Sequence, residues 1–243
     1  MHMLILGANS DVGYAVAKVF AQRERAHLYL ASRDMENLQA RIQDLNIRYG
    51  VEAEGFYFDA VAYQEHPRFY QQLLPKPDIV LVAFGYLGDQ RKGQADFAEA
   101  QRIIATNFLG TVSIIEKVAS DFEARGKGTI IGISSVAGER GRQSNYLYGA
   151  AKGAVTVYLS GLRNRLCRKG VKVITILPGF IRSKMTEHMV LPEILTANPQ
   201  GVAEQIHQAW MNGRDIVYVK WYWRWIMMLV RLLPEKLFKQ LNL

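Results

Sequence analysis

Three polar residues near the middle of the chain have the types and the spacing needed to transfer a proton to or from an oxygen atom. Tyr148 follows Ser135 by thirteen positions, and Lys152 follows Tyr148 by four. Residues four apart share one face of a helix, so Lys152 is expected beside Tyr148. A phenol has a pKa of about 10, and a neighbouring ammonium group favours its phenolate form. Tyr148 is therefore predicted to donate and accept a proton near neutral pH, tuned by Lys152.

Ser135 is expected to hydrogen-bond a carbonyl oxygen on which charge grows during hydride transfer. Singly, each of the three residues has an ordinary structural reading, as a turn hydroxyl, a half-buried aromatic or a solvated helix lysine. Their joint spacing after a nucleotide-type turn favours the catalytic reading. Tyr146 is a second phenol, but it lies six residues before Lys152 and does not share its helix face.

A glycine-rich turn near the start of the chain is suited to a pyrophosphate. It follows the apolar segment 3–6 and leads into the helical segment 14–22. Backbone N–H groups and a helix N-terminus can meet phosphate oxygens at such a junction. The other reading is an ordinary tight strand-to-helix turn. The residues expected at the cofactor here are Gly7, Asn9, Ser10, Asp11, Val12 and Gly13.

The second apolar segment, 27–30, ends in residues that could distinguish two dinucleotides. Ser32 and Arg33 can bind a 2′-phosphate through charge-assisted hydrogen bonds, so NADP(H) is favoured over NAD(H). The alternative is that Arg33 is solvated while Asp34 caps the following helix.

Apolar runs alternate with amphipathic stretches along the whole chain. The predicted strands are 3–6, 27–30, 79–83, 129–133, 171–177 and 216–219, and helical spacing is clear at 14–22 and 35–49. Strand and helix in strict alternation predict an α/β fold, a doubly wound (Rossmann) parallel sheet with helices on both faces. We expect one dinucleotide-binding and catalytic domain over residues 1–220, followed by an amphipathic tail over 221–243.

Composition limits the settings in which the chain can act. Its 243 residues, 49% hydrophobic, can bury one large core, and its single cysteine, Cys167, allows no internal disulfide. The chain starts close to a predicted strand, which leaves no room for a signal peptide. A cytoplasmic location fits both features.

The tail carries much of the positive charge and many large apolar side chains. The formal charge of the chain is +8, and residues 214–243 contribute six basic and two acidic residues to it. The uncharged run 225–230 is far shorter than the about 20 residues of a membrane span. Clustered Trp, Leu and Met flanked by Arg and Lys suit a membrane surface or a lipid-binding entrance. The alternative is packing on the domain or at a homo-oligomer interface. Nucleic acid is not expected as a partner, because the tail lacks a dense basic face.

These motifs together resemble the short-chain dehydrogenase/reductase family from Met3 to about Thr186. Gly7 and Gly13 match the outer glycines of the family turn, Asp59 its adenine-contacting acid, and Asn107 its structural and catalytic asparagine. Ser135, Tyr148 and Lys152 match its catalytic residues. The resemblance implies that Lys152 holds the nicotinamide ribose, that Asn107 supports a proton-relay water, and that the segment after Pro178 and Gly179 places Ile181 at the carboxamide.

Three departures from the family pattern bear on the cofactor. Asp11 replaces the middle glycine of the turn, and we expect its carboxylate to turn outward and cap the helix. After the strand 79–83, the usual Asn-Asn-Ala-Gly is replaced by 82–85, which keeps only the small Ala83 and the final Gly85. Ser183 stands where a threonine is usual and keeps the hydroxyl.

Substrate identity is the least determined property. Segment 83–90 and the Trp-rich end resemble the branch containing decaprenylphosphoryl 2-keto-pentose reductase, which implies reduction of a lipid-linked keto-sugar at the inner face of the membrane. The alternatives are a soluble ketone or 3-oxoacyl reductase and a non-catalytic nucleotide-sensing protein. A homodimer or homotetramer is expected, and His188 and His207 show no metal-ligand pattern.

Overall fold

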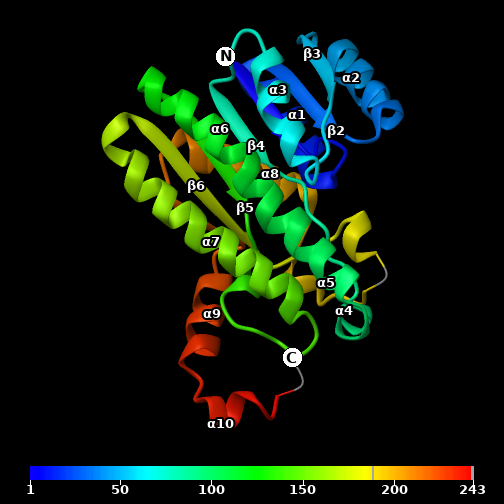
Figure 1. Ribbon diagram of the computed structural model, residues 1–243, viewed down its shortest axis with the longest axis vertical. Coiled ribbons are helices and arrows are strands. Elements are labelled where there is room, and N and C mark those ends of the chain that lie inside the picture. The colour runs from blue at the N-terminus through cyan, green and yellow to red at the C-terminus, as the bar shows by residue number, and fades with distance from the viewer. Residues whose placement is uncertain (188, 242–243) are drawn as a thin grey trace.

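A parallel sheet forms the centre of the computed structural model, which describes residues 1–187 and 189–241 (Figure 1). Within these residues the sheet has seven strands in the order β3-β2-β1-β4-β5-β6-β9. The strands are β1 (His2–Leu6), β2 (His27–Ser32), β3 (Ala53–Tyr57), β4 (Ile79–Val82), β5 (Gly128–Ile133), β6 (Val171–Pro178) and β9 (Ile216–Val219). All six predicted strands are present and pair in parallel.

The strand β3 was not predicted. It pairs with β2 at one edge of the sheet, so its outer side has no neighbouring strand. Glu54 and Tyr57 are exposed, and only Ala53 at its start is buried. An edge strand of this kind lacks the continuous apolar run that marks the inner strands of a parallel sheet.

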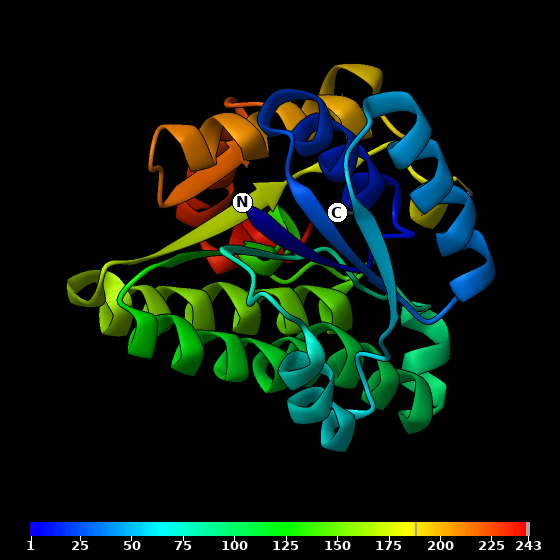
Figure 2. The ribbon, with the colours of Figure 1, turned by 90° about the horizontal axis from the view of Figure 1, so that it is seen from above.

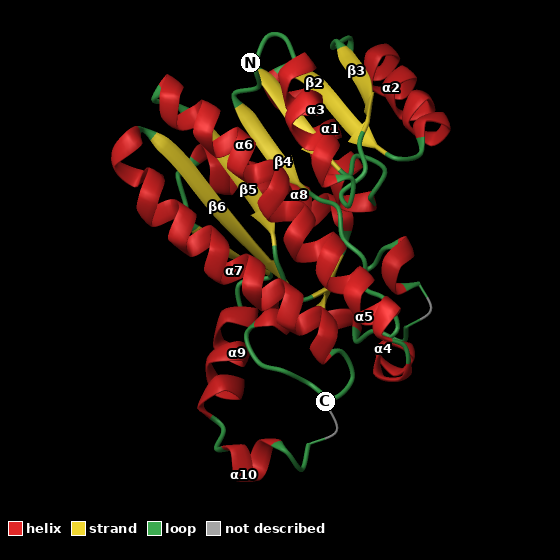
Figure 3. Ribbon diagram, in the orientation of Figure 1, coloured by secondary structure: helices red, strands yellow, loops and turns green. Residues whose placement is uncertain are grey.

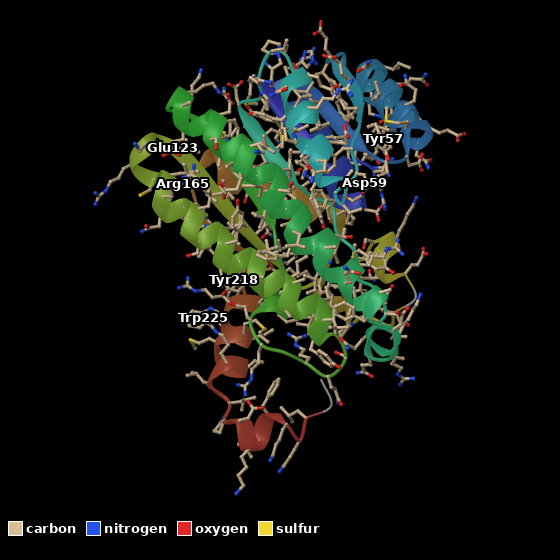
Figure 4. All side chains as sticks on the ribbon, viewed as in Figure 1. Tyr57, Asp59, Glu123, Arg165, Tyr218 and Trp225 are labelled. Atoms are coloured by element: carbon tan, nitrogen blue, oxygen red, sulfur yellow. The ribbon has the colours of Figure 1, made fainter. Side chains whose placement is uncertain are left out.

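Helices cover both faces of the sheet, as expected for a doubly wound fold (Figure 2). One face carries α1 (Asp11–Glu24), α2 (Met35–Tyr49) and α8 (Pro199–Met211), whose buried residues form one core with the sheet. The other carries α3 (His66–Gln72), α6 (Gly110–Arg125) and α7 (Tyr146–Leu166), which form a second core (Figure 3). Far from the carboxyl ends of the strands, Arg165 of α7 is paired with Glu123 of α6 (Figure 4).

The direction of chain connection changes at β1. From β1 the chain moves outward to β2 on one side, and it later returns to β4 on the other side. At such a switch point the loops that follow the two strands diverge and leave a crevice at their carboxyl ends. The turn after β1 and the segment after β4 therefore form the two walls of the predicted cofactor site.

Helix caps explain where α1 and α2 begin. The N-cap of α1 is Ser10, whose Oγ accepts from the Gly13 N–H at 3.0 Å. Asp34 is the N-cap of α2 and accepts from the Asn37 N–H at 3.0 Å, as one reading of the sequence anticipated. The expectation that Asp11 caps α1 was wrong, because Ser10 fills that position and Asp11 is the first helical residue.

A helical stretch, 97–125, runs beside the predicted site. It consists of α5 (Phe97–Ile104), a π-helical turn (Ala105–Leu109) and α6, and α4 (Gln90–Ala95) precedes it. Its length and composition alone would suit a membrane span, but buried core helices of other proteins pass the same test. Here α6 packs beside α3 and α7. The π-helical turn contains Asn107, whose carbonyl accepts from the Thr111 hydroxyl at 2.7 Å. Such turns are frequent at functional sites.

The last part of the chain packs beyond the carboxyl ends of the strands (Figure 1). Strands β7 (Phe180–Ile181) and β8 (Thr196–Ala197) pair with each other, and α9 (Trp223–Leu232) and α10 (Glu235–Phe238) follow β9. Trp223 and Met227 of α9 are buried against Val136 and Leu177. The beginning of the tail is therefore part of the folded body.

Candidate active site

A cavity of about 290 Å³ opens at the carboxyl ends of the central strands. Most of the predicted site residues line it: Asn9, Ser10, Asp11, Val12, Ala83, Gly85, Ser135, Tyr148, Lys152, Pro178, Gly179, Ile181 and Ser183. The remaining ones, Gly7, Gly13, Ser32, Arg33, Asp59 and Asn107, are absent from the lining and shape or flank it. Tyr146 is likewise outside the lining and is exposed. Segments separated by more than 170 positions thus meet at one site.

Tyr148 lies in the first turn of α7 and faces Ser135 at the end of β5. Burial raises the pKa of Tyr148 to about 12, and its hydrogen bond with Ser135 acts in the opposite direction. The Ser135 hydroxyl also accepts from the Ala137 N–H at 3.1 Å, which orients it. The prediction that Lys152 and an oxidised nicotinamide lower this pKa is not met by the chain itself, because burial outweighs the hydrogen bond with Ser135. Tyr148 is a neutral phenol at pH 7 and can donate a proton.

Lys152 lies one helical turn beyond Tyr148, as predicted. Its side chain is only 4% exposed, its ammonium donates to the Ile133 carbonyl at 3.0 Å, and Nζ lies 5.7 Å from the Tyr148 ring centroid. Burial lowers the pKa of Lys152 to about 8. The side chain is therefore still mostly protonated at neutral pH. Ser134, which the sequence analysis missed, donates to the Lys152 carbonyl at 2.8 Å and holds this turn of α7 against β5.

Asn107 is fully buried behind Gly85. Its amide donates to the carbonyls of Tyr86 and Ile103 at 2.7 and 2.8 Å, and its Oδ1 accepts from the Tyr86 N–H at 3.2 Å. A Cβ at position 85 would lie 3.0 Å from Asn107 Oδ1 and 3.7 Å from Lys152 Nζ. Glycine at this position therefore lets the Asn107 side-chain carbonyl oxygen and the Lys152 ammonium group both lie close to the backbone of residue 85.

The turn after β1 packs tightly against neighbouring backbone because two of its residues are glycines. Gly7 has a φ of +86°, and a Cβ there would lie 2.5 Å from the Phe84 nitrogen. A Cβ at Gly13 would lie 2.6 Å from the Gly7 carbonyl oxygen. This packing brings the start of α1 to the cavity, which Ser10, Asp11 and Val12 line, and the N-terminus of a helix suits a pyrophosphate.

Asp11 has a different role from the one expected. Its Oδ2 accepts from the Lys184 N–H at 2.7 Å and so joins the start of α1 to the loop after β7. Arg41 of α2, which the sequence analysis missed, donates to the Ala8 carbonyl at 3.1 Å. Burial lowers the pKa of Arg41, while the charge of Asp11 acts to raise it. The carboxylate of Asp11 is thus partly balanced by a nearby cation, which reduces its repulsion of a phosphate.

The predicted adenosine end lies at the tips of β2 and β3. The Asn9 amide donates to Ser32 Oγ at 2.9 Å and connects this end to the glycine-rich turn. The Arg33 side chain is 62% exposed, and its guanidinium lies 4.0 Å from a carboxylate oxygen of Asp59 (Figure 4). Asp34 caps α2 and Arg33 is largely solvated, as one of the two readings anticipated. Binding of a 2′-phosphate by Ser32 and Arg33 stays a prediction.

The tail contributes directly to the opposite wall of the cavity. A Cβ at Gly179 would lie 2.0 Å from the Trp223 ring, so the indole packs directly on the glycine backbone. The indole N–H donates to the Leu195 carbonyl at 3.2 Å. Trp225, two residues later on α9, is half exposed (Figure 4). Packing on the domain was one of the alternatives expected for the tail, but nothing local to the segment indicated Gly179 as its contact.

The histidines show no sign of metal binding where they can be described. His207 is paired with Glu24 across α8 and α1 at 2.7 Å, and His188 lies outside the described residues. No group of three His, Cys, Asp or Glu side chains suited to a metal occurs in the part of the chain that the structure describes.

The comparisons with known proteins agree with the geometry of the site. Residues 1–193 match the family model described as short chain dehydrogenase. The chain belongs to the short-chain dehydrogenase family. It is accordingly an NAD(P)-dependent oxidoreductase. An uncharacterized oxidoreductase of Mycobacterium tuberculosis is 31% identical over 98% of this chain and 96% of its own length.

Solved structures share the fold of this short-chain dehydrogenase at lower identity. A short-chain dehydrogenase from Sphingobium yanoikuyae in complex with NADPH has a TM-score of 0.82 at 22% identity, covering 96% of each chain. A bulky-bulky ketone specific alcohol dehydrogenase from Comamonas testosteroni has a TM-score of 0.79 at 21% identity, covering 96% of this chain and 95% of its own.

Proposed function

We propose that this short-chain dehydrogenase reduces a carbonyl compound to an alcohol, with Tyr148 as the proton donor. The observation that carries this proposal is a neutral phenol at the cavity wall, hydrogen-bonded to Ser135 and one helical turn from the Lys152 ammonium. When bound, the reduced nicotinamide supplies the hydride to the carbonyl carbon. Tyr148 then donates its proton to the carbonyl oxygen.

The neighbouring residues support this proton transfer. The Ser135 hydroxyl holds the carbonyl oxygen as negative charge develops on it. The Lys152 ammonium stabilises the phenolate that is left on Tyr148, and on the family resemblance it also holds the nicotinamide ribose. Asn107 fixes the backbone at Tyr86 through its amide contacts and, on the same resemblance, supports the relay that returns a proton.

NADP(H) is the proposed cofactor, with NAD(H) as the alternative. The exposed Arg33 guanidinium beside the Ser32 hydroxyl offers donors for a 2′-phosphate, and the similar Sphingobium enzyme holds NADPH. We expect Arg33→Ala to raise the Michaelis constant for NADPH about tenfold while that for NADH changes little. An unchanged constant for NADPH would remove Arg33 from the cofactor site.

The catalytic proposal is tested with purified protein and a panel of keto-sugars, ketones and 3-oxoacyl thioesters, following NADPH oxidation. Tyr148→Phe is expected to lower turnover at least about a hundredfold, since the variant keeps the ring but has no proton to donate. Tyr146→Phe is the matched control, because Tyr146 lies on the same helix outside the cavity. Turnover that survives in Tyr148→Phe would refute the proposal. No turnover with any compound would favour a nucleotide-sensing protein.

We propose a lipid-linked keto-sugar as the substrate and the inner membrane surface as the place of reaction. Exposed apolar side chains on the tail, including Trp221, Leu229 and Leu232, lie among basic residues such as Arg224. This composition suits the headgroup region of a membrane. Trp223, in the same segment, lines the cavity. The alternative is a soluble ketone or 3-oxoacyl reductase whose tail only closes the cavity.

Co-sedimentation with anionic liposomes separates these two readings. We expect the full chain to bind, and a Trp225→Ser and Leu229→Ser double variant to bind much less, because both side chains are exposed and their loss leaves the core intact. Equal binding by both proteins, or no binding by either, would contradict the membrane proposal. Limited proteolysis tests the proposed division into a domain (1–220) and a tail (221–243). Light scattering tests the proposed homodimer or homotetramer, and cell fractionation tests the proposed cytoplasmic location.

A further inference from the structure

Arg142 is a cation in the wall of the cavity that has no acidic partner among the described residues. It lies in the loop between β5 and α7 and lines the same cavity as Tyr148. Its Nε is buried and donates to none of the described groups, and one terminal nitrogen contacts only the Met227 sulfur, at 3.5 Å. A thioether sulfur is a weak acceptor, so neither of these two donors has a strong partner among the described residues.

The electrostatics of Arg142 differ from those of other partly buried arginines in the chain. Burial alone lowers the pKa of Arg142, and no carboxylate opposes it. By contrast, Arg140 donates to the carbonyls of Val230 and Leu233 and is paired with Glu235, while Arg163 lies 3.7 Å from Asp215. A guanidinium stays charged in proteins, and a buried charge without a partner is strongly unfavourable. Such a group is stabilised when a ligand brings the missing anion.

The surroundings of Arg142 favour an anion with an apolar body. Val136, Phe180 and Trp223 line the same cavity and pack with Met227, the residue that Arg142 contacts. Among the described lining residues the acidic one is Asp11, and it accepts from the Lys184 N–H on the cofactor side. Arg142 instead contacts α9 through Met227, away from the turn proposed to bind the cofactor phosphates. An anion at Arg142 is therefore expected to belong to the substrate.

We infer that Arg142 binds an anionic oxygen group of the substrate, a carboxylate or a phosphate, and thereby directs the carbonyl toward Tyr148. This inference rests on the proposed carbonyl reduction for its orientation, but the anion site itself does not depend on turnover. A guanidinium binds carboxylate and phosphate oxygens alike through paired N–H groups. The substrate class is thus an acidic ketone or a phosphorylated keto compound.

Calorimetry with the NADPH-loaded full chain tests the site directly. The probes are benzoate for the carboxylate source, phenyl phosphate for the phosphate source and benzyl alcohol as their neutral counterpart. We expect at least one anion to bind and benzyl alcohol to bind much more weakly. Arg142→Met should weaken the binding of that anion about tenfold to a hundredfold, because a hydrogen-bonded charge pair is lost. Arg142→Lys should restore part of it.

Arg140→Met is the matched control, since it also removes a guanidinium, two positions from Arg142. The Arg140 side chain already has partners, the Val230 carbonyl and the Glu235 carboxylate. It should leave the preference for the anion over benzyl alcohol in place. If neither anion binds the wild-type chain, or if Arg142→Met binds them as well as the wild type does, the inference is refuted. Loss of the preference in Arg140→Met but not in Arg142→Met would refute it equally.

A turnover experiment separates this inference from the proposed function. 3-Benzoylpropionate and its methyl ester present the same ketone with and without a carboxylate, and phenacyl phosphate and 2-hydroxyacetophenone do so for a phosphate. The inference predicts that kcat/KM favours the anionic member of one pair and that Arg142→Met removes this preference. Equal kcat/KM for the two members of each pair would refute the inference but would still support the proposed carbonyl reduction. Anion binding lost in Arg142→Met, without any turnover, would support the inference and count against the reductase.

Discussion

Replacing Lys152 by methionine is expected to change how the stability of the protein depends on pH. Burial lowers the pKa of Lys152 from 10.5 to about 8, and the side chain is almost fully buried. Each pKa unit corresponds to about 1.4 kcal/mol, so the buried ammonium costs at most about 3.5 kcal/mol of folding stability. Methionine has a similar length and carries no charge.

The sign of this effect follows from proton linkage. Below about pH 8, Lys152 is charged in both the folded and the unfolded chain, and the full cost applies. Between about pH 8 and 10.5 the folded state releases its proton first, so the cost shrinks, and above this range it vanishes. The free energy of unfolding of the wild type should therefore rise, relative to that of Lys152→Met, by about 3 kcal/mol from pH 7 to pH 10.5.

Urea unfolding of both proteins at several pH values measures this difference. Loss of the hydrogen bond to the Ile133 carbonyl adds an offset that does not vary with pH, so the slope is the decisive quantity. Lys169→Met, at an exposed position, controls for the removal of a lysine. A difference between the wild type and Lys152→Met that is constant from pH 7 to pH 10.5 would refute the reasoning.

Three further outcomes follow from the same contacts. Carbonyl reduction should decline as the pH rises through about 8, where Lys152 loses its charge, and a rate that stays flat to pH 10 would contradict this. Gly179→Ala should lower thermal stability by about 1 to 3 kcal/mol, because its Cβ meets the Trp223 ring, whereas Gly161→Ala has open space and should not destabilise; equal melting temperatures would contradict the contact. Asp11→Asn should weaken the attachment of the loop after β7, seen as faster amide exchange there, and unchanged exchange would exclude this role.

Much of the fold could be read from local sequence patterns. Buried parallel strands need continuous apolar runs, and the six predicted strands, including β9 at the other edge of the sheet, have them. Edge strand β3 escaped prediction because it lacks such a run: only Ala53 is buried, while Glu54 and Tyr57 are exposed. The proximity of Tyr148 and Lys152 followed from helix geometry alone, which requires no knowledge of the remaining chain.

Other properties of the site depend on contacts between distant segments. Asp11 could be expected to cap α1 from its position, but its actual partner is 173 residues away. Packing of the tail on the domain was one of its predicted alternatives, but the contact of Trp223 with Gly179 and its place in the cavity wall were not predicted. Neither contact leaves a periodic or spacing signal, since each depends on how the loops beyond the sheet are packed.

The residue types and intervals of the chain were sufficient to establish the family, the parallel sheet and the identity of the proposed proton donor, because strand burial and helical periodicity are local consequences of sequence. The protonation of that donor was not accessible in this way. Tyr148 was expected to have a lowered pKa, and the structure shows a raised one, because burial depends on every element that surrounds the phenol. The same holds for Arg142, whose lack of an acidic partner among the described residues is decided only when α7, α9 and the loops between them are packed together.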